Sequence, residues 1–124
     1  MKEENTQSPF SEEEIHALAD HLKGIYDMAI AAYTPMVDDI CRRKATQKEV
    51  DWLLTWMFDF VGYEPFLPLF KRVCRAYWQI YPETVAFYIM EYRIEYDPES
   101  LIGTEYEHLL REREAEWAAL EKDD

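Results

Sequence analysis

The most apolar stretch of the chain runs from Val50 to Val61. Nine of its twelve residues are apolar or aromatic, and the polar residues Asp51, Thr55 and Asp59 recur every four positions. On an α-helix this spacing gives one narrow polar stripe on an otherwise apolar surface. Because neighbouring elements cover a helix of that kind on nearly all sides, we expect this stretch to form a buried central helix.

Five further stretches place apolar residues at three- and four-residue steps, the spacing of amphipathic helices. They cover residues 11–33, 35–44, 66–81, 82–96 and 104–120. In the first, the predicted core stripe includes Ile15, Leu18 and Leu22. Pro35 disfavours helical backbone at the residue before it, so we expect the chain to break or kink there, with a shorter helix after it.

Three of these helix starts carry a capping box, in which Ser or Thr is followed three positions later by Glu. The boxes are Ser11 with Glu14, Thr46 with Glu49, and Thr104 with Glu107. No alternating run typical of a strand and no internal repeat is present in the sequence. We therefore predict an all-α fold, a compact single-domain bundle of five to six helices over residues 11–122. Residues 1–10 are polar and are expected to form a flexible tail.

Composition agrees with a folded domain and excludes several chemistries. The 124 residues are 48% hydrophobic and 15% aromatic, and only three are glycine, too few for a phosphate-binding loop. Cys41 and Cys74 lie in apolar helical patterns without metal-ligand spacing, which indicates reduced core thiols. No apolar run follows the N-terminal lysine, and no stretch is suited to cross a bilayer, so we expect a cytoplasmic protein.

The net charge of −13 is concentrated at the two ends of the chain. Residues 1–28 carry seven acids and two bases, and residues 97–124 carry ten acids and three bases, whereas the middle is nearly balanced with nine acids and eight bases. Such a chain is repelled by nucleic-acid phosphates and anionic membranes and attracted to basic protein surfaces. The alternative is that the charge only maintains solubility.

Two Glu-x-x-His pairs, Glu13 with His16 and Glu105 with His108, have the spacing used in di-iron helical bundles. A metal site requires that both pairs point inward, but each is predicted to lie on a water-facing side of its helix. We therefore predict no metal and no cofactor. His21 is expected at a packing edge, and the few serines offer no catalytic triad, so no catalytic residue is predicted.

Carboxylates paired along one helix face include Asp51 with Asp59 and Glu91 with Glu95. If buried, they require cationic partners or raised pKa values. The available cations are Arg72, Arg75 and Arg93. Ion pairing within the bundle is the favoured interpretation, and acid–base catalysis is the alternative.

Aromatic residues are more numerous in the middle of the chain than a core of this size needs, so some should lie at an interface. The candidates lie off the main apolar stripes, namely Trp52, Trp56, Phe60, Trp78 and Tyr88. Tryptophans next to basic residues could also stack on single-stranded nucleic acid, but the low sequence pI of about 4.6 argues against direct nucleic-acid binding.

The leading functional prediction is a non-enzymatic acidic helical module that binds another protein, one with a basic surface. In a sharper form, the acidic first and last helices lie side by side, mimic the charge of a nucleic acid and occlude the basic groove of a partner, like inhibitors of the phage or mobile-element type. The acidic residues assigned to this surface are Glu12, Glu13, Asp20, Asp27, Glu105, Glu112 and Glu116.

Two alternatives come from other functional classes. The first is a homodimer or larger homo-oligomer, a scaffold subunit that buries its surplus aromatic side chains against a copy of itself. The second is a metal-dependent enzyme that uses paired carboxylates.

Overall fold

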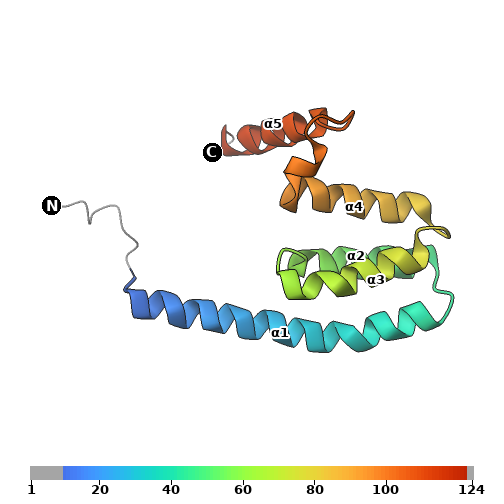
Figure 1. Ribbon diagram of the computed structural model, residues 1–124, viewed down its shortest axis with the longest axis horizontal. Helices are drawn as coiled ribbons and strands as arrows, with labels where there is room; N and C mark the ends of the chain where they lie inside the picture. Colours follow the sequence, from blue (N-terminus) through green and yellow to red (C-terminus); the bar gives the residue numbers. More distant parts are fainter. Residues whose placement is uncertain (1–9, 123–124) are drawn as a thin grey trace.

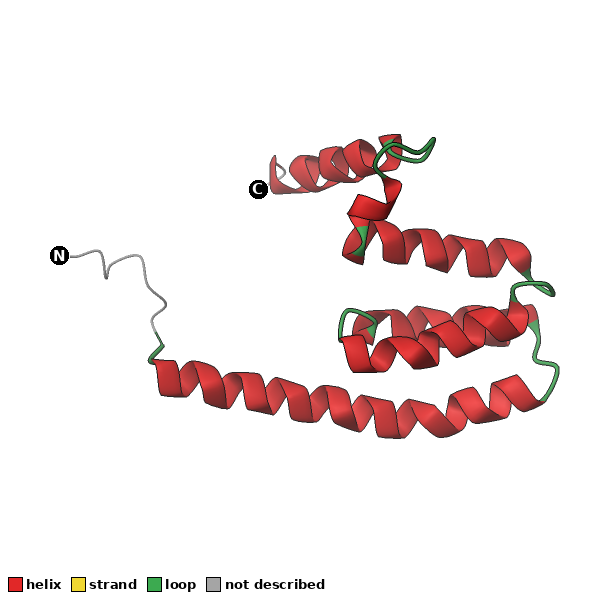
Figure 2. Cartoon of the chain, viewed as in Figure 1, coloured by secondary structure: helices red, strands yellow, loops and turns green. Residues whose placement is uncertain are grey.

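The computed structural model describes residues 10–122, so the predicted tail lies almost wholly outside the described residues (Figure 1). The described part contains five α-helices joined by turns and short 3-10 helices, with no strand, which confirms the all-α prediction (Figure 2). In chain order the elements are α1 (Glu12–Arg42), α2 (Gln47–Met57), η2 (Phe58–Phe60), η3 (Glu64–Phe66), α3 (Leu67–Tyr77), α4 (Pro82–Tyr96), η4 (Pro98–Leu101) and α5 (His108–Lys122).

The first two predicted capping boxes are present and set where α1 and α2 begin. At α1 the Ser11 hydroxyl accepts the Glu14 N–H at 3.1 Å, and the Glu14 carboxylate accepts the Ser11 N–H at 2.9 Å. Thr46 and Glu49 exchange the same two hydrogen bonds at 3.1 and 2.8 Å. Each box satisfies two backbone donors that a helix start otherwise leaves without an intrahelical partner.

The third predicted box does not form, and α5 begins four residues later than expected. The Glu107 carboxylate accepts the N–H of Gly103 at 3.0 Å, and the Thr104 hydroxyl accepts the N–H of Tyr106 at 3.1 Å. Gly103 has φ of +84°, a left-handed conformation that favours glycine and redirects the chain. Residues 104–107 therefore form successive turns, and the helix starts only at His108.

Pro35 does not end the first helix, which continues as one element to Arg42. A proline inside a helix removes one backbone hydrogen bond and costs about 3 kcal/mol or more. The helix persists because its apolar stripe continues past the proline with Val37 and Ile40, which are 0% and 4% exposed. Figure 1 shows that α1 is curved rather than straight, as a proline-containing helix is expected to be.

The helices stack in layers, with α1 on one side, α2 and α3 in the middle, α4 next and α5 on the far side (Figure 1). The core lies where α1, α2, α3 and α4 meet, and α3 packs on all three of the others. Its most deeply buried side chains are Val37, Val50, Leu54, Met57, Val61, Phe66, Val73, Tyr77 and Val85. No residue of α5 is buried.

The predicted central helix is shorter and less covered than expected. It ends as an α-helix at Met57 and continues as η2, and its buried face consists of Val50, Leu53, Leu54 and Met57. Trp52 and Trp56 on the other face are 62% and 49% exposed. Burial on nearly all sides is therefore not confirmed, because α3 and α4 cover only one face of α2.

Candidate functional site

The seven acidic residues assigned to a partner surface are all exposed. They are Glu12, Glu13, Asp20 and Asp27 on α1, Glu105 in the turn before α5, and Glu112 and Glu116 on α5. However, α5 lies on the opposite side of α2, α3 and α4 from α1 (Figure 1). The expectation that the two acidic helices lie side by side is therefore wrong, because the three intervening helices stack between them.

Several of these carboxylates already have partners nearby. Asp27 accepts hydrogen bonds from Lys23 at 2.8 Å and from the Tyr63 hydroxyl at 3.0 Å, and these contacts lower the pKa of Asp27. On α5, Glu112 lies 3.9 Å from His108, and Glu116 lies 3.4 Å from Arg113. Part of the terminal negative charge is thus balanced locally.

The paired carboxylates of α4 attach α5 to the rest of the molecule. Arg113 lies 2.9 Å from Glu91 and 2.5 Å from Glu95, so its guanidinium bridges the two carboxylates (the Arg113 bridge). Ion pairing was predicted, but the proposed arginine partners were wrong. Arg72 pairs instead with Asp38 at 2.9 Å, Arg93 donates to Ser100 at 2.9 Å, and no ion pair of Arg75 is present within residues 10–122. The cation that pairs with Glu91 and Glu95 is Arg113 of α5, and the position of α5 relative to α4 could not be deduced from the sequence.

Of the five aromatic residues assigned to an interface, three are exposed, Phe60 is half-buried against Phe66, and Tyr88 is buried. Trp52 and Trp56 form an edge-to-face pair with ring centroids 5.7 Å apart, and Trp78 is 57% exposed. Tyr88 is only 8% exposed and packs against Phe58. Its hydroxyl donates to Asp51 Oδ1 at 3.0 Å and also contacts the Thr55 hydroxyl. The prediction that Tyr88 lies at the surface is wrong, because the polar stripe of α2 satisfies its hydroxyl inside the bundle.

An uncovered apolar stripe, which the sequence pattern did not reveal, lies on the first half of α1. We call residues 12–25 the free segment of α1, because every residue in it is exposed. Its stripe residues Ile15, Leu18, Leu22 and Ile25 were expected in the core but are 42%, 50%, 44% and 43% exposed. The same helix face is covered from Ala29 onward, where Ala29 is 8% exposed. In Figure 1 the free segment extends beyond the ends of α2 and α3.

Length explains this uncovered face. At 1.5 Å per residue, α1 with 31 residues is about 46 Å long, whereas α2 and α3 with 11 residues each span about 16 Å. The short helices can cover only the second half of α1. Had Pro35 been interpreted as an internal residue, this mismatch would have been visible in the sequence.

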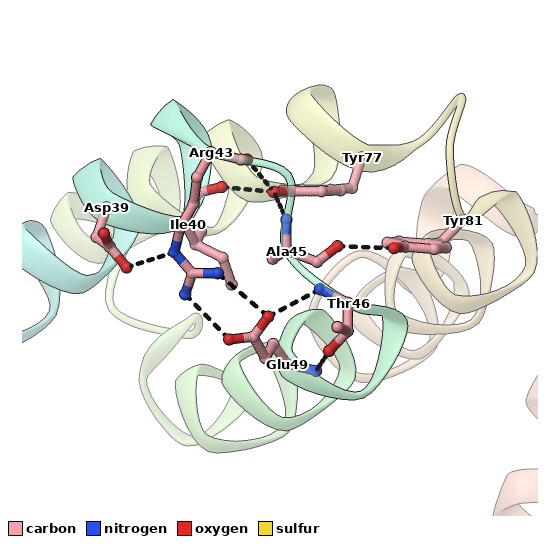
Figure 3. A network of polar contacts seen from close by, with 8 residues as sticks. All are labelled: Asp39, Ile40, Arg43, Ala45, Thr46, Glu49, Tyr77 and Tyr81. Carbon is pink, nitrogen blue, oxygen red and sulfur yellow. Dashed lines mark hydrogen bonds and ion pairs between the residues drawn. The ribbon is translucent and has the colours of Figure 1, made fainter.

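Two tyrosines hold the connection between α1 and α2, namely Tyr77 at the end of α3 and Tyr81 in the turn that follows. The Tyr77 hydroxyl accepts the N–H of Ala45 at 2.9 Å and lies 2.5 and 2.7 Å from the carbonyl oxygens of Ile40 and Arg43 (Figure 3). The Tyr81 hydroxyl donates to the Ala45 carbonyl at 2.6 Å. These contacts fix the angle between α1 and α2.

On the outer side of this connection Arg43 bridges two carboxylates. It lies 2.9 Å from Asp39 and 3.1 Å from Glu49, and hydrogen bonding to Arg43 lowers the pKa of Glu49 to about 2 (Figure 3). Beside these charges is an open cavity of about 410 Å³, whose apolar wall includes Met36 and Trp52. Its two cations, Arg43 and Lys48, balance its two carboxylates, so it has no net charge that would select a ligand.

Metal-ligating side chains do not gather in the described part of the chain, where no group of three His, Cys, Asp or Glu residues could hold an ion. Glu13, His16, Glu105 and His108 are all exposed.

Both cysteines, Cys41 and Cys74, are free thiols. Burial raises the pKa of Cys74 to about 12, so this thiol stays protonated and unreactive at neutral pH. Within residues 10–122, no helix combines the length and the apolar character that crossing a bilayer requires.

Comparison with known proteins returns no family model, no curated protein and no solved structure that matches this chain.

Proposed function

We propose that this protein is a non-enzymatic, cytoplasmic module that binds another protein through the free segment of α1, and that the partner contributes a basic amphipathic helix. The observation that carries the proposal is the uncovered stripe of Ile15, Leu18, Leu22 and Ile25, each at least 42% exposed. Helix-in-groove recognition uses apolar side chains at this spacing.

The low stability of an uncovered helix favours a partner on this segment. Helical stability in proteins comes mostly from tertiary packing of an apolar face, and residues 12–25 are all exposed. Gly24 weakens it further, since glycine in a helix costs about 1 kcal/mol relative to alanine. A partner that covers the stripe would supply the apolar burial that normally stabilises such a helix.

Charge selects the chemistry of the partner. The free segment carries the carboxylates Glu12, Glu13, Glu14 and Asp20 against one lysine, Lys23. A second copy of the chain would bring like charges together, whereas a basic helix would meet opposite charge. The remaining acids on α5 add to the long-range attraction of a basic partner but lie on another side of the molecule.

Binding of a designed peptide tests the proposal. The probe is an amphipathic peptide with leucine on one helical face and lysine on the other, and its control is a scrambled peptide of equal composition. We expect the amphipathic peptide to bind more tightly than the scrambled one by fluorescence anisotropy, and added salt to weaken its binding.

Variants of the stripe locate the contact. The double variant Leu18→Gln/Leu22→Gln should weaken peptide binding by more than about tenfold, because burying each leucine contributes about 1.5–3 kcal/mol. The matched control, Ala17→Gln, places the same side chain on another face of the helix and should change little. Equal binding of the scrambled peptide, or an unaffected double variant, would contradict the proposal.

A second candidate function is a homo-oligomeric scaffold subunit, and the exposed tryptophans favour it. Trp52, Trp56 and Trp78 are 62%, 49% and 57% exposed, which is more than core packing explains. Light scattering over a range of protein concentrations tests it. A protein that remains monomeric at the highest concentration would exclude this candidate.

A further inference from the structure

A concave corner forms where the free segment of α1 meets the rest of the molecule. It is lined by Tyr26 of α1, Asp59 of η2, Gly62 and Tyr63 of the following turn, and Tyr96 at the end of α4. The cavity has a volume of about 320 Å³ and opens to solvent. A helix lying along the uncovered stripe of α1 would end against this corner, because from that point onward α1 is in contact with Phe60 of η2 and with η3.

Aromatic rings form the walls of the corner. Tyr26 and Tyr63 stack with ring centroids 4.8 Å apart and an interplanar angle of 15°. Tyr96 lies directly over Gly62, since a Cβ at residue 62 would come within 2.7 Å of the Tyr96 ring. Glycine at this position therefore allows the third ring to close the corner.

The corner also carries one carboxylate, Asp59, that no cation of the described residues 10–122 balances. Asp59 is exposed, and none of the lysine, arginine or histidine side chains in residues 10–122 forms an ion pair with it. Asp27 stands beside Tyr63 and accepts its hydroxyl hydrogen bond at 3.0 Å, but its charge is already balanced by Lys23 at 2.8 Å, so Asp59 is the carboxylate left for a ligand. Burial, followed by nearby carboxylates including Asp59, raises the pKa of Tyr96, so this ring remains neutral at physiological pH.

We propose that the corner of Tyr26, Asp59, Gly62, Tyr63 and Tyr96 binds a cationic side chain, arginine or lysine, of the protein that docks on α1. A cation within about 6 Å of an aromatic ring face is attracted by the ring quadrupole, and the carboxylate of Asp59 adds an ion pair. The inference rests on the proposed function, because it identifies the residue that anchors the end of the basic partner helix.

The test uses amino-acid probes and the intact protein. N-acetyl-L-arginine amide and N-acetyl-L-lysine amide are titrated into ¹⁵N-labelled protein, with N-acetyl-L-glutamine amide as the neutral control. We expect saturable shifts of the Gly62 amide and its neighbours with the cationic probes only. A stronger response to arginine would indicate stacking of its planar guanidinium on the tyrosines, whereas equal responses would indicate a simple charge site.

Variants separate the site from general charge attraction. Asp59→Asn should reduce the affinity for the cationic probes by about fivefold. The control Glu64→Gln removes the same charge at the start of the neighbouring η3 and should leave binding of the probe unchanged. Gly62→Ala should displace the Tyr96 ring and also weaken binding of the cationic probes. Absence of saturable shifts at Gly62, or equal losses in Asp59→Asn and Glu64→Gln, would overturn the inference.

The peptide experiment distinguishes failure of this inference from failure of the proposed function. If the amphipathic peptide binds the stripe but the arginine and lysine probes leave Gly62 unchanged, the proposed function stands and the anchor site is wrong. If the probes bind at Gly62 but Leu18→Gln/Leu22→Gln does not affect the peptide, the site stands and docking along α1 is wrong.

Discussion

At the scale of single residues, buried hydroxyl groups determine how the helices are joined. Tyr77 and Tyr81 are aromatic members of an apolar stripe, yet their hydroxyls hold the backbone of Ala45, 32 and 36 residues earlier in the chain (Figure 3). The Tyr88 hydroxyl likewise joins α4 to α2, because it donates to the Asp51 carboxylate. The sequence identified these rings as apolar, but only the fold shows which backbone groups their hydroxyls satisfy.

Replacing Tyr77 with phenylalanine should test this joint. The change leaves the buried N–H of Ala45 without its acceptor, and a buried unsatisfied donor costs about 1–3 kcal/mol. We expect a loss of that size in the free energy of unfolding measured with urea. Tyr106→Phe, at a residue that is 41% exposed, is the control and should change little. Equal stability of Tyr77→Phe and the natural protein would show that water or a rearranged backbone replaces the hydroxyl.

Glu49 should contribute to stability only above acidic pH. Its hydrogen bond with Arg43 lowers its pKa from 4.5 to about 2 in the folded protein. Because the folded value is lower, the contribution is fully present above pH 4.5 and is lost as the pH falls toward 2. Glu49→Gln should therefore show a weaker decline of unfolding free energy over this window than the natural protein. Glu83→Gln at the start of α4 is the control, and an unchanged decline in Glu49→Gln would refute the assignment.

At the scale of elements, α5 and the free segment of α1 differ from the rest of the bundle. α2, α3, α4 and the second half of α1 each bury at least three side chains, whereas α5 buries none and the free segment of α1 is exposed throughout. The Arg113 bridge links α5 to α4, and the Arg113 side chain is 24% exposed. Such partly exposed ion pairs weaken when salt is added.

Removing the bridge should release α5. In Arg113→Ala we expect faster amide hydrogen exchange across His108–Lys122 and no large change in α2 or α3. Arg111→Ala, two residues earlier on an exposed position, is the matched control. If exchange in α5 is equal in both variants, the apolar contacts with α4 rather than the ion pairs hold the helix.

At the scale of the whole molecule, stability should be concentrated in the middle of the chain. The core includes residues from Ala29 to Tyr88, and the acidic helical ends lie outside it. The net charge of −13 is also unevenly distributed, because the two ends of the chain carry most of it. This arrangement separates a rigid aromatic centre from two charged surfaces that face solvent.

Hydrogen exchange of the free protein should show this division directly. We expect slow exchange in residues 37–77 and fast exchange in residues 12–25, although both regions include parts of the same helix α1. Addition of the amphipathic peptide should slow exchange in residues 12–25. Uniform protection along α1 without the peptide would contradict this expectation. It would mean that the free segment is stable alone and needs no partner for its stability.

The sequence by itself determined the helical class and two capped helix starts. These features depend on neighbours within four residues, which is the range of capping and of helical periodicity. The tertiary structure alone decided which apolar faces are covered. Ile15 and Val37 occupy the same stripe of α1, yet one is 42% exposed and the other 0%, because shorter helices pack against only one half of α1. The same long-range geometry buried Tyr88, separated the acidic ends and brought Tyr26, Asp59 and Tyr96 to one corner.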